Sequence, residues 1–201
     1  MIVSAAMLIR ERGARPTAIG DVLAHSGAPR GSAYHYFPGG RNQLLCEAVD
    51  YAADYVAAAI AEAHSCVEIL DIAVRLYRDG LIDSDYRAGC PVMAVAVEAG
   101  DPDIGADVLA HAAAAFDRWG ELITRRLVAD GVARKKAADL SALSVAALEG
   151  ALVLARAGRD AAAVRLVAVS KTDSADHVRA AIAAGQQDFG ENKVQEGLQK
   201  I

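Results

Sequence analysis

Alanine is the residue that most restricts what this chain can fold into. It occupies 45 of the 201 positions, whereas aromatic residues make up only 5% of the sequence. Alanine has the highest helix propensity, and the aromatic and β-branched residues that favour strands are scarce over most of the chain. The composition therefore predicts an all-α protein and argues against a β-sandwich or a β-barrel.

The sequence also argues against a membrane or secreted protein. No run of about 18 apolar residues is free of charge, so we expect no membrane-spanning helix, and no signal peptide is recognisable. The cysteines, Cys46, Cys66 and Cys90, fit neither a disulfide framework nor a zinc pattern, and the histidines lack metal-ligand spacing. We therefore expect a cytoplasmic protein with reduced thiols and no metal site.

Charge is distributed unevenly along the chain. Residues 1–47 hold five Arg and three acidic residues, a net charge of +2, whereas residues 48–163 hold 11 basic and 18 acidic residues, a net charge of −7. Salt limits the electrostatic reach of the acidic segment 48–163 to about 10 Å, so the basic segment 1–47 can still bind phosphates.

Three short helices are predicted within residues 1–47. Apolar residues recur at helical spacing over residues 2–12, where a glycine follows and ends the helix. Thr17 is a good N-cap for a second helix, and a third helix runs over residues 29–37 between two prolines. Two short helices joined by a Gly-containing turn are typical of a helix-turn-helix, so this segment is predicted to be a DNA-binding domain.

Longer helices are predicted for residues 48–163, as a regulatory and dimerisation domain. The patterns give helices over 41–64, 66–79, 91–99, 104–129 and 134–157. The last of these has a wide apolar face, which serves either a dimer interface or the core of the monomer.

The composition changes after residue 163, and residues 164–201 are predicted to be an appended strand–loop–helix fragment, not an independent domain. Residues 164–169 have the composition of a buried parallel strand, which needs neighbouring strands that a helical chain does not supply. We therefore expect this run to be irregular or drawn into a helix. We expect Ala175–Ala184 to be helical and the chain from Gln186 onward to be mobile.

The third helix has two distinct faces. Its inner face, Ala33, Tyr36 and Phe37, is expected to pack on the first two helices. The outer face combines a cation, a residue without a side chain and two polar-tipped rings, which suit base edges, phosphates and thymine methyl groups in a major groove: Arg30, Gly31, Tyr34 and His35. The alternative is that this face is only a solvated surface.

Two further residues are predicted to hold DNA phosphates. Arg41 stands at the start of the fourth helix, where its charge adds to free backbone amides. Thr17 can offer its hydroxyl and its amide at the start of the second helix. The alternative for Arg41 is a solvated charge.

These residues carry a resemblance to a known family. Thr17, Gly27, the run RGSAYHYF at 30–37 and the run PGGRNQLLCEAV at 38–49 resemble the DNA-binding domain of TetR-type transcriptional repressors. The resemblance implies that the third helix is the recognition helix and that Thr17 and Arg41 contact the DNA backbone. The implied recognition contacts are Arg30, Ser32, Tyr34 and His35. Such repressors usually carry basic residues before the first helix, so here that arm is absent or the true start lies upstream.

The rest of the chain resembles two different families. AGCPVMAVAVEAGD at 88–101 and ALEGALVLARAGRD at 147–160 resemble the lincomycin-resistance repressor and its flavonoid-responsive relatives, which implies a helical ligand chamber and a dimer formed by the last two long helices. RLVAVSKT at 165–172 and the segment 180–201 resemble YggS-type pyridoxal-phosphate homeostasis proteins, whose Schiff-base lysine corresponds to Lys171. That family forms a (β/α)₈ barrel of typically about 250 residues, so only a fragment is present and no cofactor is expected.

We therefore predict a homodimeric transcriptional repressor and not an enzyme. It would read a near-palindromic DNA operator and be released by a small apolar or aromatic effector. The chamber that binds the effector would be lined by some of the few aromatic residues of the regulatory domain and by one methionine. The candidates are Tyr51, Tyr55, Tyr77, Tyr86, Met93, Phe116 and Trp119. Ordinary core packing is the alternative for each of them. The alternative functions are a pyridoxal-phosphate-binding protein using Lys171 and a helical dimer without a DNA role.

Overall fold

The computed structural model describes residues 1–164, 167–169 and 188–190. The chain divides into two compact units, Met1–Val164 and Arg165–Ile201, and each is described by itself.

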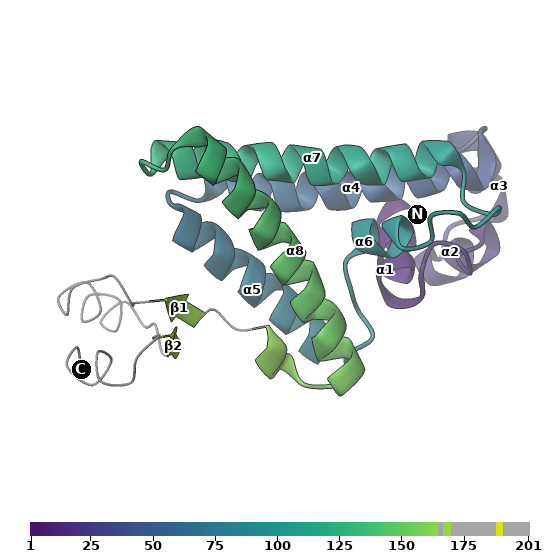
Figure 1. Cartoon of the computed structure of the whole chain (residues 1–201). Coiled ribbons are helices and arrows are strands. Elements are labelled where there is room, and N and C mark those ends of the chain that lie inside the picture. The colour runs from purple at the N-terminus through teal and green to yellow at the C-terminus, as the bar shows by residue number, and fades with distance from the viewer. Residues whose placement is uncertain (165–166, 170–187, 191–201) are drawn as a thin grey trace, which may run out of the picture. The chain divides into compact units, whose positions relative to one another are not determined.

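Three short helices form the N-terminal part of the first unit: α1 (Ile2–Arg12), α2 (Ile19–Ser26) and α3 (Arg30–Tyr36). Gly27 ends α2 in the left-handed region, at a φ of 68°, which a residue with a Cβ adopts only with strain. The turn that follows places α3 beside α2, as Figure 1 shows. Ile9, Val22 and Phe37 are buried between the helices and hold them together.

The larger part of the first unit consists of longer helices. These are α4 (Gly40–Glu62), α5 (Cys66–Asp83), α6 (Pro91–Ala96), α7 (Ala106–Ala129) and α8 (Arg134–Gly158), followed by the short 3₁₀ helix η1 (Ala161–Ala163). In Figure 1, α4 and α7 lie side by side along their length, and α8 packs across α7 and α5. The all-α fold class that the composition predicts is thus confirmed.

Small residues let α4 and α7 approach closely. Ala53, Ala57 and Ala112 are buried at this contact, and the Trp119 ring nitrogen donates a hydrogen bond of 3.0 Å to the Ala53 carbonyl. The alanine content therefore does more than favour helix, because it also sets how near two helices can lie.

α8 differs from the expectation on membrane helices. By length and composition alone it is apolar enough to cross a membrane, although charged residues interrupt it. In the structure it packs on α7 and α5, and the Ser141 hydroxyl donates a hydrogen bond of 2.7 Å to the Gly120 carbonyl. We interpret α8 as a packing helix whose outer side remains apolar.

The tail contains a strand that we expected to be absent. β1 (Val167–Val169) pairs in parallel with β2 (Asp188–Gly190), with Ala168 opposite Phe189. The expectation was wrong because the tail supplies its own partner strand, so the helical unit need not provide one. The helix expected at 175–184, the mobility expected from Gln186 and the position of Lys171 lie outside the described residues.

Candidate nucleic-acid interface and ligand chamber

α3 presents a solvent-exposed face that matches the outer face predicted from the sequence. The side chain of Tyr34 is 78% exposed, Arg30, Gly31 and His35 are exposed, and Ser32 is half-buried. A Cβ added to Gly31 would meet nothing within 4 Å, so this point of the helix is open to close approach by a partner. Ala33 and Phe37 anchor the opposite face in the core.

Tyr36 is a correction to the predicted inner face of α3. Its side chain is 64% exposed and its ring lies edge-on against the His35 ring, with ring centroids 4.9 Å apart. The buried stripe of this short helix consists of Ala33 and Phe37, four residues apart, and Tyr36 is turned about 100° from Phe37 around the axis. The exposed face therefore carries three neighbouring rings instead of two.

Thr17 does not have the position that the sequence predicts. It is 1% exposed, its hydroxyl donates to the Gly13 carbonyl at 2.7 Å and its amide donates to the Ala14 carbonyl at 2.9 Å. The N-cap of α2 is Ala18, whose amide donates to the Asp21 carboxylate at 3.1 Å. Thr17 is therefore not the N-cap of α2, and both of its polar groups donate inside the turn between α1 and α2; its contact with a DNA phosphate stays a prediction.

Arg41 is also engaged by the protein itself. Its guanidinium donates hydrogen bonds to the carbonyls of Thr17 (2.9 Å), Ala14 (2.6 Å), Arg15 (3.0 Å) and Asp103 (2.9 Å). These carbonyls come from the turn between α1 and α2 and from the loop before α7. Four of the five N–H groups of the guanidinium are thereby occupied, so Arg41 joins three segments of the protein, and its contact with a DNA phosphate stays a prediction.

Glu98 strengthens the same junction and is a residue that sequence reasoning missed. Its carboxylate accepts hydrogen bonds from the backbone amides of Ala14 (3.1 Å) and Arg15 (2.9 Å). The Arg15 side chain in turn pairs with Asp101 at 3.2 Å. The loop between α6 and α7 is thus tied to the turn between α1 and α2, which connects the N-terminal part (α1–α3) to the body, the longer helices α4–α8.

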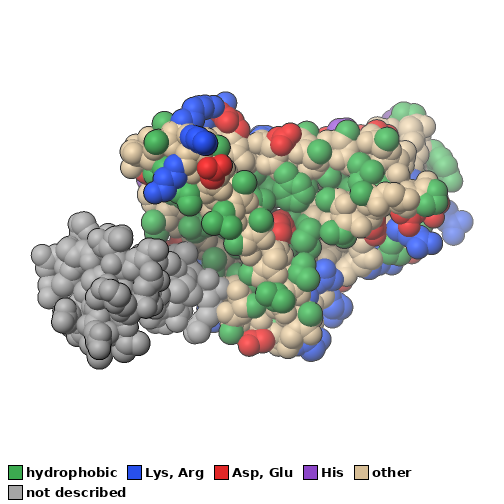
Figure 2. All heavy atoms as spheres, in the orientation of Figure 1, with side chains coloured by type: hydrophobic (Ala, Val, Ile, Leu, Met, Phe, Trp, Pro, Cys, Tyr) green, Lys and Arg blue, Asp and Glu red, His purple; other side chains and the backbone are tan. Residues whose placement is uncertain are grey.

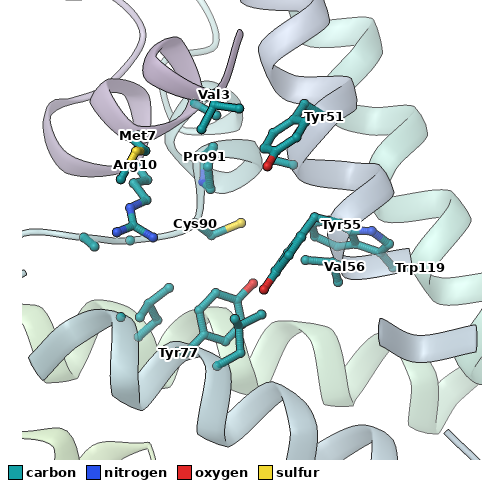
Figure 3. Close-up of a pocket in the computed structure, with 17 residues that line it drawn as sticks. Val3, Met7, Arg10, Tyr51, Tyr55, Val56, Tyr77, Cys90, Pro91 and Trp119 are labelled. Carbon is teal, nitrogen blue, oxygen red and sulfur yellow. The ribbon is translucent and has the colours of Figure 1, made fainter. Parts of the chain in front are cut away.

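A cavity of about 320 Å³ lies between α1, α4, α5 and the segment 88–91 (Figure 3). This volume is within the range of small-molecule pockets. Four of the seven predicted ligand residues line it: Tyr51, Tyr55, Tyr77 and Trp119. Residues of α1 also line it, namely Val3, Ala6, Met7 and Arg10, and the sequence pattern did not indicate them because their neighbours come from distant segments. We call this cavity the chamber.

The other three predicted ligand residues lie elsewhere. Met93 and Phe116 line a separate, more open groove of about 580 Å³ between α6, α7 and α8. The Tyr86 ring lies under the Arg159 guanidinium, 5.5 Å from it. The structure therefore does not bring these three residues into the chamber.

A buried carboxyl group adjoins the chamber. Glu149 is 9% exposed, and its Oε2 atom has no hydrogen-bond partner within the described residues. It lines a second, small cavity of about 50 Å³ that shares Tyr77 and Trp119 with the chamber. Burial raises the pKa of Glu149 to about 7, while hydrogen bonds from Cys90 and Tyr77 act in the opposite direction.

Comparison with known proteins covers both parts of the first unit. Residues 2–48 match the family model "Bacterial regulatory proteins, tetR family", and residues 66–171 match "Transcriptional regulator LmrA/YxaF-like, C-terminal domain". An uncharacterized HTH-type transcriptional regulator of Mycobacterium tuberculosis, Rv0196, is 58% identical over 170 residues, covering 83% of this chain and 88% of that protein. The crystal structure of the regulatory protein TetR from Rhodobacter sphaeroides shares the fold, with a TM-score of 0.70 at 20% identity over 81% of this chain and 90% of that chain.

The end of the chain has a different relative. A pyridoxal phosphate homeostasis protein of Pseudomonas aeruginosa is 64% identical over 44 residues, which are 22% of this chain and 19% of that protein. This confirms the resemblance of the tail to a fragment of such proteins. Lys171, the residue implied as the Schiff-base lysine, lies outside the described residues.

Proposed function

Because this chain belongs to the TetR family of DNA-binding transcriptional regulators, we propose that it is a cytoplasmic, homodimeric repressor that a small apolar or aromatic effector releases from its operator. The regulators that it resembles are not enzymes. The observation that carries the proposal is the exposed face of α3, which is held on the core by Ala33 and Phe37.

The exposed face of α3 offers the groups that read a major groove. Arg30 can donate to guanine edges or to a phosphate, and Gly31 permits close approach of the backbone to the DNA. Ser32, Tyr34 and His35 can donate to phosphates, and the two rings can also contact thymine methyl groups.

The outer side of α8 supports a homodimer. Figure 2 shows hydrophobic side chains gathered along α8 and between α8 and α7. Leu143 is 63% exposed and Leu154 is 66% exposed, and the residues near them on this side are small: Ala142, Ala146, Ala147, Gly150 and Ala157. A second copy would bury these leucines and let two helices approach closely. Two recognition helices related by a two-fold axis read a near-palindromic operator, with half-sites about 34–36 Å apart.

The position of the chamber supports control by an effector. Its wall includes α1, which belongs to the DNA-binding part, together with α4 and α5 of the body. A ligand that binds one arrangement of these helices better than another shifts the population toward it. If the favoured arrangement has the wrong spacing of recognition helices, the operator is released.

The DNA-binding half of the proposal is tested with an operator selected from random duplexes by the wild-type protein. We expect Tyr34→Ala/His35→Ala to lose the specific footprint, with circular dichroism and dimer mass unchanged, because both side chains are exposed and hold no core contact. Val67→Ala, an exposed apolar residue on α5, is the control and keeps the footprint. A double variant that protects the same bases would show that α3 does not read the operator.

The effector half is tested by fluorescence. Trp119 is the only tryptophan of the chain and it lines the chamber, so a ligand bound there changes its emission. We expect compounds that perturb Trp119 also to lower operator affinity. A set of compounds that perturb Trp119 and leave the operator bound would contradict control through the chamber.

A further inference from the structure

One residue gives the chamber a charge. Among the described residues that line it, Arg10 is the only one with a formal charge at neutral pH, and no carboxylate lines the cavity. In Figure 3 its side chain extends from α1 toward the space beside Cys90. The remaining lining residues are apolar, aromatic or weakly polar.

Arg10 has no acidic partner among the described residues. Its Nε atom is buried without a hydrogen-bond partner, and Arg10 takes part in none of the ion pairs formed within residues 1–164. The neighbouring Glu11 pairs instead with Arg87, at 3.5 Å, and Arg12 on the same helix pairs with Asp21, at 2.8 Å. A charge at a cavity wall without a partner carries an uncompensated desolvation free energy. An anionic ligand that pairs with it therefore gains more binding free energy than it would from a solvated arginine.

Two glycines of the chamber lining lie close to arginine side chains. Gly80 and Gly89 both line the chamber, and a Cβ added to Gly80 would lie 3.9 Å from Arg10 Nη1. A Cβ added to Gly89 would lie 2.8 Å from Nη1 of Arg156, so a second guanidinium lies behind this glycine. Two guanidinium groups thus lie near this wall of the chamber, and Arg10 is the one that belongs to its lining.

The rest of the lining donates hydrogen bonds and offers apolar surface. The hydroxyl groups of Tyr51, Tyr55 and Tyr77 point into the chamber in Figure 3. Those of Tyr51 and Tyr55 can donate to an anion, whereas the Tyr77 hydroxyl is hydrogen-bonded to Glu149. Apolar side chains and the Trp119 ring form the walls. This arrangement suits a molecule with one acidic end and an apolar or aromatic body.

We propose that the chamber selects an amphipathic organic anion, with its carboxylate or sulfonate group paired to Arg10 and its apolar body held between the tyrosines and Trp119. This inference rests on the proposed function and specifies its effector class. The acidic group would also contact α1 directly. The Arg10 carbonyl accepts a hydrogen bond of 2.7 Å from the Gly89 amide, which joins α1 to the segment 88–91. A displacement of Arg10 by a ligand would therefore move α1 relative to this segment.

The test uses two fluorescent probes with the same body. These are 1-anilinonaphthalene-8-sulfonate, which is an anion, and N-phenyl-1-naphthylamine, which lacks the sulfonate, each titrated into the full chain with energy transfer from Trp119 as the readout. We expect the wild-type protein to bind the sulfonate about tenfold more tightly than the neutral probe, because a charge-assisted hydrogen bond is added. Arg10→Met should remove this preference without changing affinity for the neutral probe, and Arg10→Lys should keep part of it.

Arg78→Met is the matched control, because Arg78 is an exposed arginine on α5 outside the chamber lining; it should leave both affinities unchanged. Equal affinity of the wild-type protein for both probes would overturn the proposal, as would an unchanged preference in Arg10→Met. If Arg10→Met and Arg10→Lys both lost affinity for the two probes equally, the proposal would also be overturned, since Arg10 would then only stabilise the fold. Operator release is measured separately, so anion selection without release would refute the regulatory function and leave the anion site standing.

Discussion

Arg41 offers the sharpest test of how the DNA-binding part is held to the body. Its guanidinium donates four hydrogen bonds to carbonyls of the turn between α1 and α2 and of the loop before α7. Arg41→Met removes all four donors and keeps most of the apolar length of the side chain. A hydrogen bond to a charged group contributes about 1.5–3 kcal/mol, but water replaces some of these bonds at a half-buried site, so we expect a total loss of about 2–4 kcal/mol.

That loss is measurable by thermal and urea unfolding. For a chain of this size about 1 kcal/mol corresponds to about 2–4 °C in Tm, so Arg41→Met should melt roughly 4–16 °C lower. The same variant should leave the dependence of operator affinity on salt almost unchanged, because no phosphate contact is removed. The control is Arg30→Met, which changes an exposed residue of α3 and should behave in the opposite way, with an unchanged Tm and a slope lower by about one.

The reasoning has a clear point of failure. If Arg41→Met kept the wild-type Tm and lowered the salt slope by about one, Arg41 would hold a phosphate, as the sequence pattern indicates, and its four carbonyl contacts would carry no stability. A lower Tm together with an unchanged slope would support the structural role.

Three further predictions concern α8 and the tail. The pKa of Glu149 is raised from 4.5 to about 7 by burial, so the folded state holds a proton that the unfolded state loses, and stability should fall as the pH rises from about 4.5 to 7. Glu149→Gln should therefore be more stable than the wild type at pH 8 by about 1–3 kcal/mol in urea unfolding, with little difference at pH 4.5; equal stability at pH 8 would contradict this. Leu143→Glu/Leu154→Glu places charges on the exposed apolar side of α8 and should give monomers in sedimentation analysis, whereas an intact dimer would locate the interface elsewhere. The protein mixed with pyridoxal phosphate and then dialysed should show no stoichiometric Schiff-base absorption; a band that disappears in Lys171→Ala would favour the cofactor-binding alternative.

Much of the fold was predictable from local patterns. The limits of α1 follow from apolar spacing and a glycine that ends the helix, and the exposed and buried sides of α3 follow from its periodicity, with Tyr36 as the exception. Glycine conformations and helical periodicity depend on residues within one or two turns of the chain, so one sequence is sufficient to predict them, whereas the N-cap predicted at Thr17 lies at Ala18. The long helices were also recognisable from their apolar spacing, although α5 runs to Asp83, beyond the predicted end at residue 79, and α6 ends earlier, at Ala96.

The roles of individual polar residues depended on tertiary structure. Thr17 and Arg41 have the residue type and the position of phosphate-binding groups, yet their polar atoms are used by carbonyls of the protein itself. Arg10 looks in the sequence like any arginine of a basic helix. Only the tertiary structure places it at the wall of a cavity that α5 and the segment 88–91 also line, without an ion-pair partner among the described residues. A sequence determines which hydrogen bonds and charges a side chain can offer. Which partner it meets depends on segments tens of residues away, because in a closely packed helical protein the nearest carbonyl, carboxylate or cavity belongs to another helix.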